Sequence, residues 1–297
     1  MKDSTIVVSA PGKIHLLGEH AVVYGKPALL AAINLRVTVT IIANTSLANT
    51  SKKDFDPLRS EASSFEVKKV IEPIIKKELK IKKIPSYKLK ISSQIPIGSG
   101  LGSSAAVSAS YIVALLIFLK VNWDLNFINK LAYEAEKVFH GNPSGADNST
   151  VLFGGLMWYR KETPNLKLIH PVPFTIPSKI AKNFVIINTG TPKESTKDMV
   201  KLVKNLYEKR PSIVEKFLNN QEKLVRELLI AIKESDEGGV FRIIRAGEKN
   251  LETIGVASKF AQDIIRKIEK SGGAAKICGS GATNGPTGAL LCYHPKP

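Results

Sequence analysis

A run rich in glycine and serine, Pro96-Ile97-Gly98-Ser99-Gly100-Leu101-Gly102-Ser103-Ser104, carries the clearest chemical signal in the chain. Glycine lets a backbone take turns that other residues forbid, and the apolar stretch after the run, Val107 to Phe118, predicts a helix. A glycine loop that enters a helix N-terminus directs bare N–H groups at one place, where the helix dipole attracts phosphate. The run therefore predicts a site for a phosphorylated ligand, with a nucleotide as the first candidate.

This run does not match either of two common phosphate-binding motifs. It lacks the Gly-Lys-Ser/Thr ending of a Walker A loop, and its glycine spacing departs from the dinucleotide-binding fingerprint. Glycine turns also precede buried helices in proteins that bind no phosphate, so a purely structural loop is the alternative. The function must therefore be argued from further segments.

Three other glycine-marked segments carry reactive side chains. The first is Ala10-Pro11-Gly12-Lys13 with Gly18-Glu19-His20-Ala21-Val22-Val23-Tyr24-Gly25, the second is Glu136-Lys137-Val138-Phe139-His140-Gly141-Asn142-Pro143-Ser144-Gly145-Ala146-Asp147-Asn148, and the third is Asn188-Thr189-Gly190-Thr191-Pro192. Taken singly, each has a structural explanation: Lys13 as a surface lysine, His20 as a turn histidine, Asp147 as a helix cap. Only their combination points to chemistry.

Together and in this order, these segments resemble the GHMP kinases, a superfamily of small-molecule kinases, over most of the chain from Pro11 to about Gly281. The Gly-Glu-His-Ala segment and the Asp147 segment are similar to the branch that phosphorylates the 5-hydroxyl of mevalonate, whereas galactokinases would show Glu-His-Thr-Asp. The resemblance implies an ATP-dependent kinase with an α+β fold of two domains. These would be an N-terminal ribosomal-protein-S5-like domain and a C-terminal ferredoxin-like α/β sandwich.

The resemblance also implies roles for individual residues. It assigns the phosphates of ATP to Pro96, Gly98, Ser99, Gly100, Leu101, Gly102, Ser103 and Ser104. It assigns Mg²⁺ to Ser104 and Glu136, whose oxygen atoms suit that hard cation. It assigns mevalonate to Lys13, Glu19, His20, Asp147 and Thr189.

Asp147 and Lys13 are the residues that the resemblance implies to be catalytic. The Asp147 carboxylate would accept or orient the proton of the substrate hydroxyl. The Lys13 ammonium beside it would keep that carboxylate ionised and stabilise charge on the transferring group. Since a loose phosphoryl-transfer transition state needs little prior deprotonation, the extent of base catalysis stays open.

One segment departs from the superfamily pattern. Its third motif usually has consecutive glycines near the C-terminus, whereas this chain reads Lys276-Ile277-Cys278-Gly279-Ser280-Gly281-Ala282-Thr283-Asn284-Gly285-Pro286. A loop of purely structural role is the alternative there. Two rival functions also stay open: a sibling kinase that acts on phosphomevalonate or another small hydroxy acid, and a non-catalytic sensor or RNA-binding protein on the same fold. The sensor would be expected to lose Asp147 or Lys13, and both are present.

Length and composition limit the remaining possibilities. At 297 residues the chain can form two domains, and a Pro-rich shift around 161–180 places the boundary so that they span 1–165 and 166–297. No stretch resembles a signal peptide or a membrane span, and the two cysteines form no metal-binding pattern, which favours a cytoplasmic protein. A homodimer stays open.

The formal net charge of +17 has two possible interpretations, a binding surface or a solvated helix face. Lysines between Lys68 and Lys90 could bind RNA or a membrane, but no aromatic residues interleave with them, which favours the solvated face of a helix. We therefore expect no nucleic acid or membrane partner. The excess charge would still attract anionic substrates.

The elements that must position these residues follow from hydropathy patterns. Strands are expected at 6–8, 14–17, 35–42, 87–91, 156–159, 184–187, 274–278 and 288–292, and a polar loop at 44–64. Helices are expected at 65–80, 103–119 and 125–138, with three or four more over 195–271. The mixture lacks strict β-α-β alternation, which argues for two α+β domains.

Overall fold

The computed structural model describes residues 5–43, 61–96, 98–140, 143–163 and 166–297. They divide into two compact units that alternate along the chain. Unit 1 comprises Met1–Gly12, Ile33–Ile95 and Gly102–Phe153, and unit 2 comprises Lys13–Ala32, Pro96–Leu101 and Gly154–Pro297. The strands β1 (Thr5–Leu17) and β2 (Ala28–Ala43) contribute to both units. The division of the sequence into domains at residue 165 stays a prediction.

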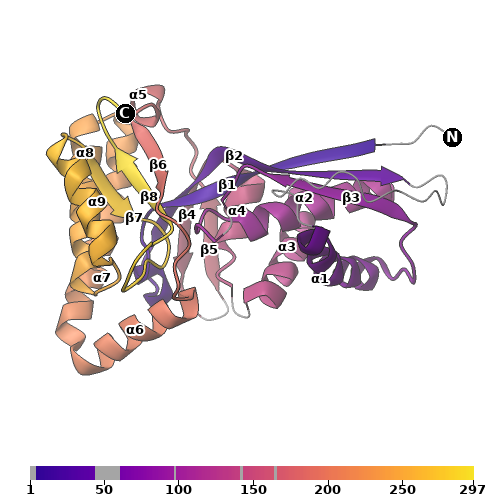
Figure 1. Ribbon diagram of the computed structural model, residues 1–297, viewed down its shortest axis with the longest axis horizontal. Helices are drawn as coiled ribbons and strands as arrows, with labels where there is room; N and C mark the ends of the chain where they lie inside the picture. The colour runs from indigo at the N-terminus through magenta and orange to yellow at the C-terminus, as the bar shows by residue number, and fades with distance from the viewer. Residues whose placement is uncertain (1–4, 44–60, 97, 141–142, 164–165) are drawn as a thin grey trace. The chain divides into compact units, whose positions relative to one another are not determined.

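Unit 1 packs helices against one face of a short antiparallel sheet (Figure 1). Strand β3 (Tyr87–Ser93) pairs with the C-terminal half of β2, from Val37↔Ser93 to Ala43↔Tyr87. The helices are α1 (Glu61–Leu79), α2 (Ser103–Phe118), α3 (Leu125–His140) and α4 (Ala146–Phe153). Helix α2 is apolar on nearly all sides and is surrounded by α1, α3 and α4, which explains why most of it is buried.

Unit 2 contains two groups of antiparallel strands. In the first, β4 (Leu156–Lys161) pairs with the start of β2 and with β5 (Lys167–Pro171). In the second, β8 (Ala289–Tyr293) lies between β6 (Phe184–Asn188) and β7 (Ala274–Ile277). The helical elements are η1 (Ala21–Tyr24), α5 (Ser178–Ala181), α6 (Thr196–Lys209), α7 (Pro211–Lys233), α8 (Glu237–Thr253) and α9 (Lys259–Lys270). Helices α8 and α9 cover β7, and their apolar side chains form the core with α6 and α7 (Figure 1).

The predicted α+β class is confirmed, and every predicted helix is present. Several local expectations were wrong, and the strand expected at 35–42 begins earlier, at Ala28. The strands expected at 6–8 and 14–17 are one continuous strand, β1, because Pro11 and Gly12 continue the extended backbone. Residues 61–64 of the expected loop already belong to α1, while 44–60 lie outside the described residues. Strand β5 and the short helix α4 were not expected.

Among the helices of the described ranges, none combines the length and the hydropathy of a membrane span.

Candidate active site

The glycine loop ends at the start of α2, and its backbone has the conformation that only glycine takes readily. Gly98, Gly100 and Gly102 have φ angles of 71°, 77° and 74°. Gly102 is the N-cap residue of α2 and has no side chain to cap the first turn, whose N–H groups point out of the helix end. Ser104 lies in this first turn and is half-buried.

Within unit 2, hydrogen bonds attach the loop to two other candidate segments. Leu101 O accepts from Lys13 N at 2.9 Å, and Ser99 O accepts from Ala289 N at 3.0 Å. The Ser99 hydroxyl donates to Pro96 O at 2.7 Å and closes the turn. The loop is thus held by the backbone of β1 on one side and of β8 on the other. These two hydrogen bonds engage carbonyl groups of the loop and not its N–H groups.

Three oxygen-bearing candidates of unit 1 come from three helices that pack on one another. Ser104 begins α2, Glu136 lies near the end of α3, and Asp147 lies in the first turn of α4. The Glu136 side chain is 3 % exposed, and a carboxylate buried to that extent requires donors or a cation nearby. Asp147 is half-buried.

The Ser104 and Glu136 side chains suit magnesium by their chemistry. A hydroxyl and a carboxylate are hard oxygen donors, and Mg²⁺ commonly uses one or two carboxylates and completes its shell with phosphate and water. Among the described residues, no group of three or more His, Cys, Asp or Glu side chains gathers as a metal site. With these two oxygen donors, nucleotide phosphates and water would complete the shell of a bound Mg²⁺.

Glu19 forms an ion pair with Lys276 in the interior of unit 2. Lys276 Nζ donates to Glu19 Oε1 and, at 2.7 Å, to the backbone oxygen of Ile277. Both side chains are at most 1 % exposed. Burial alone would lower the pKa of Lys276, but the charge of Glu19 and its other neighbours outweighs burial and raises the pKa, so the lysine stays charged. Glu19 Oε2 is buried and accepts no hydrogen bond from the described residues.

His20 is a neutral histidine that holds the C-terminal loop. Its Nε2 lies 3.0 Å from Ser280 O, so Nε2 carries the proton and donates. Burial lowers its pKa to about 4, although the Ser280 bond opposes that shift. Its φ of 59° is unusual for a residue other than glycine. Nδ1 of the neutral ring can only accept a hydrogen bond.

Thr189 uses its hydroxyl group to hold β6 against the segment before β8. Its Oγ1 donates to Gly288 O at 2.7 Å and accepts from Thr287 N at 3.0 Å. The predicted contact between Thr189 and substrate stays a prediction, and the donor of this hydroxyl is already engaged.

Lys13 is 4 % exposed on β1, with Nζ 3.4 Å from Nδ1 of His15. It belongs to unit 2, as Glu19, His20 and Thr189 do, whereas Ser104, Glu136 and Asp147 belong to unit 1. The structure therefore groups the predicted residues into two sets. The predicted meeting of the Lys13 ammonium with the Asp147 carboxylate stays a prediction.

The C-terminal loop forms an ordered turn although it has fewer glycines than the superfamily motif. Ala282 N donates to Val256 O at 3.0 Å, and Glu194 Oε1 accepts from Thr283 N at 3.0 Å. Gly281 remains necessary, since a Cβ there would lie 2.0 Å from Val256 O. Polar contacts thus fix the segment at the positions where the glycine run is interrupted.

Lys276 is the residue that sequence reasoning missed as a member of the site. From the sequence it is identified only as the opening of the glycine motif. A stronger signal was present in Ala274-Ala275-Lys276-Ile277, where a single charge stands in a short apolar strand that is buried throughout. Such a charge must be paired.

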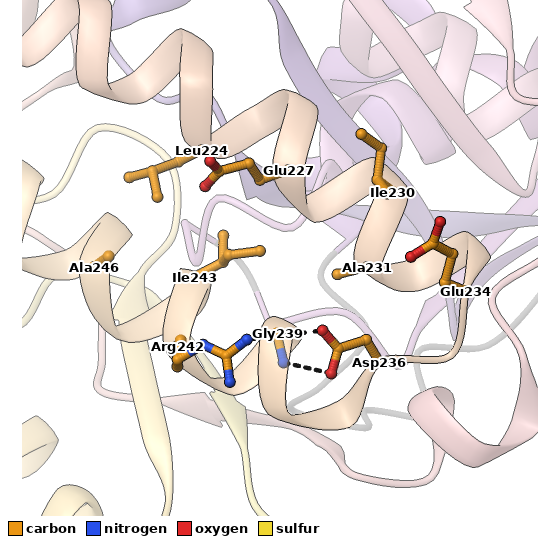
Figure 2. Close-up of a pocket in the computed structure, with 10 residues that line it drawn as sticks. All are labelled: Leu224, Glu227, Ile230, Ala231, Glu234, Asp236, Gly239, Arg242, Ile243 and Ala246. Carbon is orange, nitrogen blue, oxygen red and sulfur yellow. Dashed lines mark hydrogen bonds and ion pairs between the residues drawn. The ribbon is translucent and has the colours of Figure 1, made fainter.

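A hollow between α7 and α8 contains none of the predicted residues (Figure 2). Apolar side chains such as Leu224 and Ile243 line it, with Glu227, Asp236 and Arg242 at its edge. Asp236 accepts from Gly239 N at 2.9 Å and caps α8. Because none of the predicted residues lines this hollow, it is not the candidate site.

Two family models match the chain. Residues 66–155 match the GHMP kinases N terminal domain, and residues 1–42 match the galactokinase galactose-binding signature. Positions 21 and 22 are alanine and valine here, in place of the Thr-Asp expected of galactokinases.

Curated relatives that match most of the chain are mevalonate kinases, and solved structures of mevalonate kinases share its fold. The mevalonate kinase of Archaeoglobus fulgidus is 34 % identical over 279 residues, which cover 93 % of this chain and 89 % of that protein. The crystal structure of L. major mevalonate kinase in complex with R-mevalonate has a TM-score of 0.81 at 23 % identity, covering 99 % of this chain and 88 % of that one. The Methanococcus jannaschii mevalonate kinase structure has a TM-score of 0.78 at 23 % identity, covering 100 % and 92 %.

Proposed function

The chain belongs to the mevalonate kinase family of GHMP kinases, and we propose that it transfers the γ-phosphoryl group of ATP to the 5-hydroxyl of mevalonate. The observation that supports this proposal is that the chain has both sets of chemical groups described above, one in each unit. The oxygen donors stand on α2, α3 and α4 of unit 1, while the ammonium and hydrogen-bonding groups stand on β1 and the segments around η1 and β6 in unit 2.

The glycine loop and the start of α2 are proposed to hold the phosphates of ATP. The N–H groups at the start of the helix and the positive end of the helix dipole favour an anion there. Ser104 and Glu136 would hold magnesium, which when bound neutralises charge on the phosphates. The half-buried Ser104 and the buried Glu136 limit the access of water to that place.

Asp147 is proposed to accept or orient the proton of the substrate hydroxyl. Its position in the first turn of α4 is electrostatically favourable for the ionised form, because the helix N-terminus carries partial positive charge. Lys13 is proposed to stabilise the same carboxylate and the negative charge of the transferring group.

Glu19, His20 and Thr189 are proposed to contact mevalonate. Glu19 Oε2 is the proposed acceptor of a substrate hydroxyl, and the hydrogen bond from Lys276 Nζ to Glu19 Oε1 holds the side chain in place. Nδ1 of the neutral His20 supplies a second acceptor. Two acceptors suit a substrate with two hydroxyl groups.

The first experiment is an ADP-release assay with MgATP over mevalonate, 5-phosphomevalonate, homoserine and galactose. Turnover of mevalonate supports the proposal, and preference for another acceptor would identify a sibling kinase. Asp147→Asn should lower kcat by about 100-fold or more while ATP still binds. Asp263→Asn, an exposed aspartate on α9, is the matched control and should keep wild-type activity. Near-normal turnover in Asp147→Asn would remove this residue from the chemistry.

A magnesium titration tests the proposed ligands. Ser104→Ala and Glu136→Gln should each raise the Mg²⁺ concentration for half-maximal activity on the order of tenfold or more, since each removes an oxygen donor. Glu134→Gln is the control, because its carboxylate lies on the exposed side of α3 in an ion pair with Lys137. An unchanged titration for either variant would count against that ligand.

The cytoplasm is the proposed setting. Both cysteines, Cys278 and Cys292, are buried and form no disulfide, in keeping with a reducing compartment. A homodimer stays a prediction that sedimentation of the purified protein would check.

A further inference from the structure

Two side chains of α3 hold the segment that carries Asp147. Asn148 Nδ2 donates to Asn129 Oδ1 at 2.6 Å, and Asn129 Nδ2 donates to Ser149 Oγ at 3.1 Å. One turn further along α3, the Tyr133 hydroxyl donates to Pro143 O at 3.4 Å. The segment is therefore attached to α3 both before Asp147 and directly after it.

These contacts lie on the side of α3 that also carries Glu136. Residues 129, 133 and 136 are spaced as i, i+4 and i+7, which places them on one face of a helix. The face that presents the proposed magnesium ligand is thus the face that holds the proposed catalytic aspartate. Helices α3 and α4 pack side by side along it (Figure 1).

Helix α4 depends on such contacts because it is short. It has eight residues, and isolated helices of that length are not stable in water. Asn148 and Ser149 are buried, and both belong to its first turn, so their bonds to Asn129 fix the turn itself. Asp147 lies immediately before them in the sequence, and its Cα moves with that turn.

We propose that Asn129 is a positioning residue that sets the place of the Asp147 carboxylate relative to the magnesium ligand Glu136. This inference rests on the proposed function of Asp147. Asn129 touches no reacting atom in this scheme, and it acts through Asn148 and Ser149. An asparagine suits the task because one side chain both accepts from Asn148 and donates to Ser149.

The kinetic test compares Asn129→Ala with Asn126→Ala, an exposed asparagine of the same helix. Displacement of a catalytic group by about 1 Å can lower turnover on the order of 100-fold, so Asn129→Ala should lower kcat by about 10- to 100-fold. The KM for MgATP should stay within about twofold, because the glycine loop is untouched. Asn126→Ala should resemble the wild type. A wild-type kcat in folded Asn129→Ala would overturn the proposal.

A double-mutant cycle separates positioning from a general loss of structure. In an Asp147→Asn background, adding Asn129→Ala should lower the residual kcat by less than about twofold, because the group that Asn129 positions is already inactive. Equal losses in both backgrounds would overturn the proposal. Should Asn129→Ala fail to fold, Ser149→Ala removes one of the bonds and should give a smaller fall in kcat with the same non-additivity.

Hydrogen exchange of the backbone makes the inference testable apart from the proposed substrate. In Asn129→Ala, amides of 143–150 should exchange about tenfold faster or more, whereas Asn126→Ala should leave them unchanged. Unchanged exchange would overturn the proposed attachment. If Asn129→Ala shows faster exchange but the wild-type protein does not turn over mevalonate, the proposed function is rejected. The attachment of 143–150 to α3 through Asn129 would still be supported.

Discussion

Replacing Lys276 with methionine would leave the buried Glu19 carboxylate without the ammonium group that pairs with it. The two side chains are 0 % and 1 % exposed, so water cannot solvate the remaining charge. Removal of one partner from a buried pair costs about 3–5 kcal/mol of folding free energy, whereas a surface pair is worth about 1 kcal/mol or less. The lost bond from Nζ to Ile277 O adds about 1 kcal/mol, which the apolar packing of methionine partly offsets. We expect a net loss of about 4 kcal/mol.

Urea unfolding followed by fluorescence measures this loss, since Trp158 on β4 belongs to the same unit as the pair. A loss of that size would lower Tm by roughly 10 °C for a unit of this size. The matched control is Lys216→Met, an exposed lysine on α7, which should change stability by less than about 0.5 kcal/mol. A Lys276→Met variant within about 1 kcal/mol of the wild type would refute the account of the buried pair.

The double variant Glu19→Gln with Lys276→Met distinguishes the charge from the shape of the pair. It removes both charges and should recover stability to within about 2 kcal/mol of the wild type. Its KM for mevalonate should stay raised, because the ionised acceptor proposed to bind the substrate is gone. Recovery of both stability and KM would show that the pair serves folding alone.

Three further substitutions have expected effects on stability. Burial raises the pKa of Glu248 to about 7, so the native state holds this proton more tightly than the unfolded chain does. The free energy of unfolding of the wild type should therefore fall by about 3 kcal/mol as pH rises from about 4.5 to 7. Glu248→Gln should remove this dependence of stability on pH. Burial lowers the pKa of His20 to about 4, so stability that is present above about pH 6.5 is lost as pH falls toward 4. This dependence has the opposite sign to that of Glu248, and His20→Asn should remove it. Gly18→Ala should cost about 3 kcal/mol or more, since φ is 110° and a Cβ would lie 2.4 Å from Ala28 Cα.

Urea titrations at about pH 5 and pH 8 measure the two pH slopes. If Glu248→Gln or His20→Asn shows the same dependence of stability on pH as the wild type, the shifted pKa of that residue is not the cause. For Gly18→Ala the control is Gly255→Ala, which has φ of 74° but nothing within 4 Å of a Cβ, so it should lose only about 1 kcal/mol from backbone strain. Equal losses in the two variants would show that the close approach of Ala28 does not matter.

The sequence predicts elements well where a pattern is local. The apolar stretch after the glycine run predicts α2, and the alternation at 35–42 and 87–91 predicts the paired strands β2 and β3. Strand β5 escapes prediction because its residues are half-buried or exposed, and its conformation comes from pairing with β4 and not from its own composition. Helix α4 is too short to show a hydrophobic period.

For the candidate site, residue types and motif order predict the chemical groups but not the contacts that hold them. Lys276 pairs with a residue 257 positions away, and no local pattern reveals such a partner. Asn129 likewise looks like any polar residue of an amphipathic helix until α4 packs against it. Both residues act through tertiary contacts, and such contacts leave no recognisable residue spacing in a single sequence.

The long separation between Glu19 and Lys276 also bears on biosynthesis. Unit 2 needs residues 13–32 together with 154–297, so its early segment leaves the ribosome long before the strands that complete it. During this interval the Glu19 carboxylate stays hydrated, and its partner arrives only when β7 has been translated. Contacts so distant in sequence form slowly, which makes this unit the part of a nascent chain with the longest exposure to chaperones and proteases.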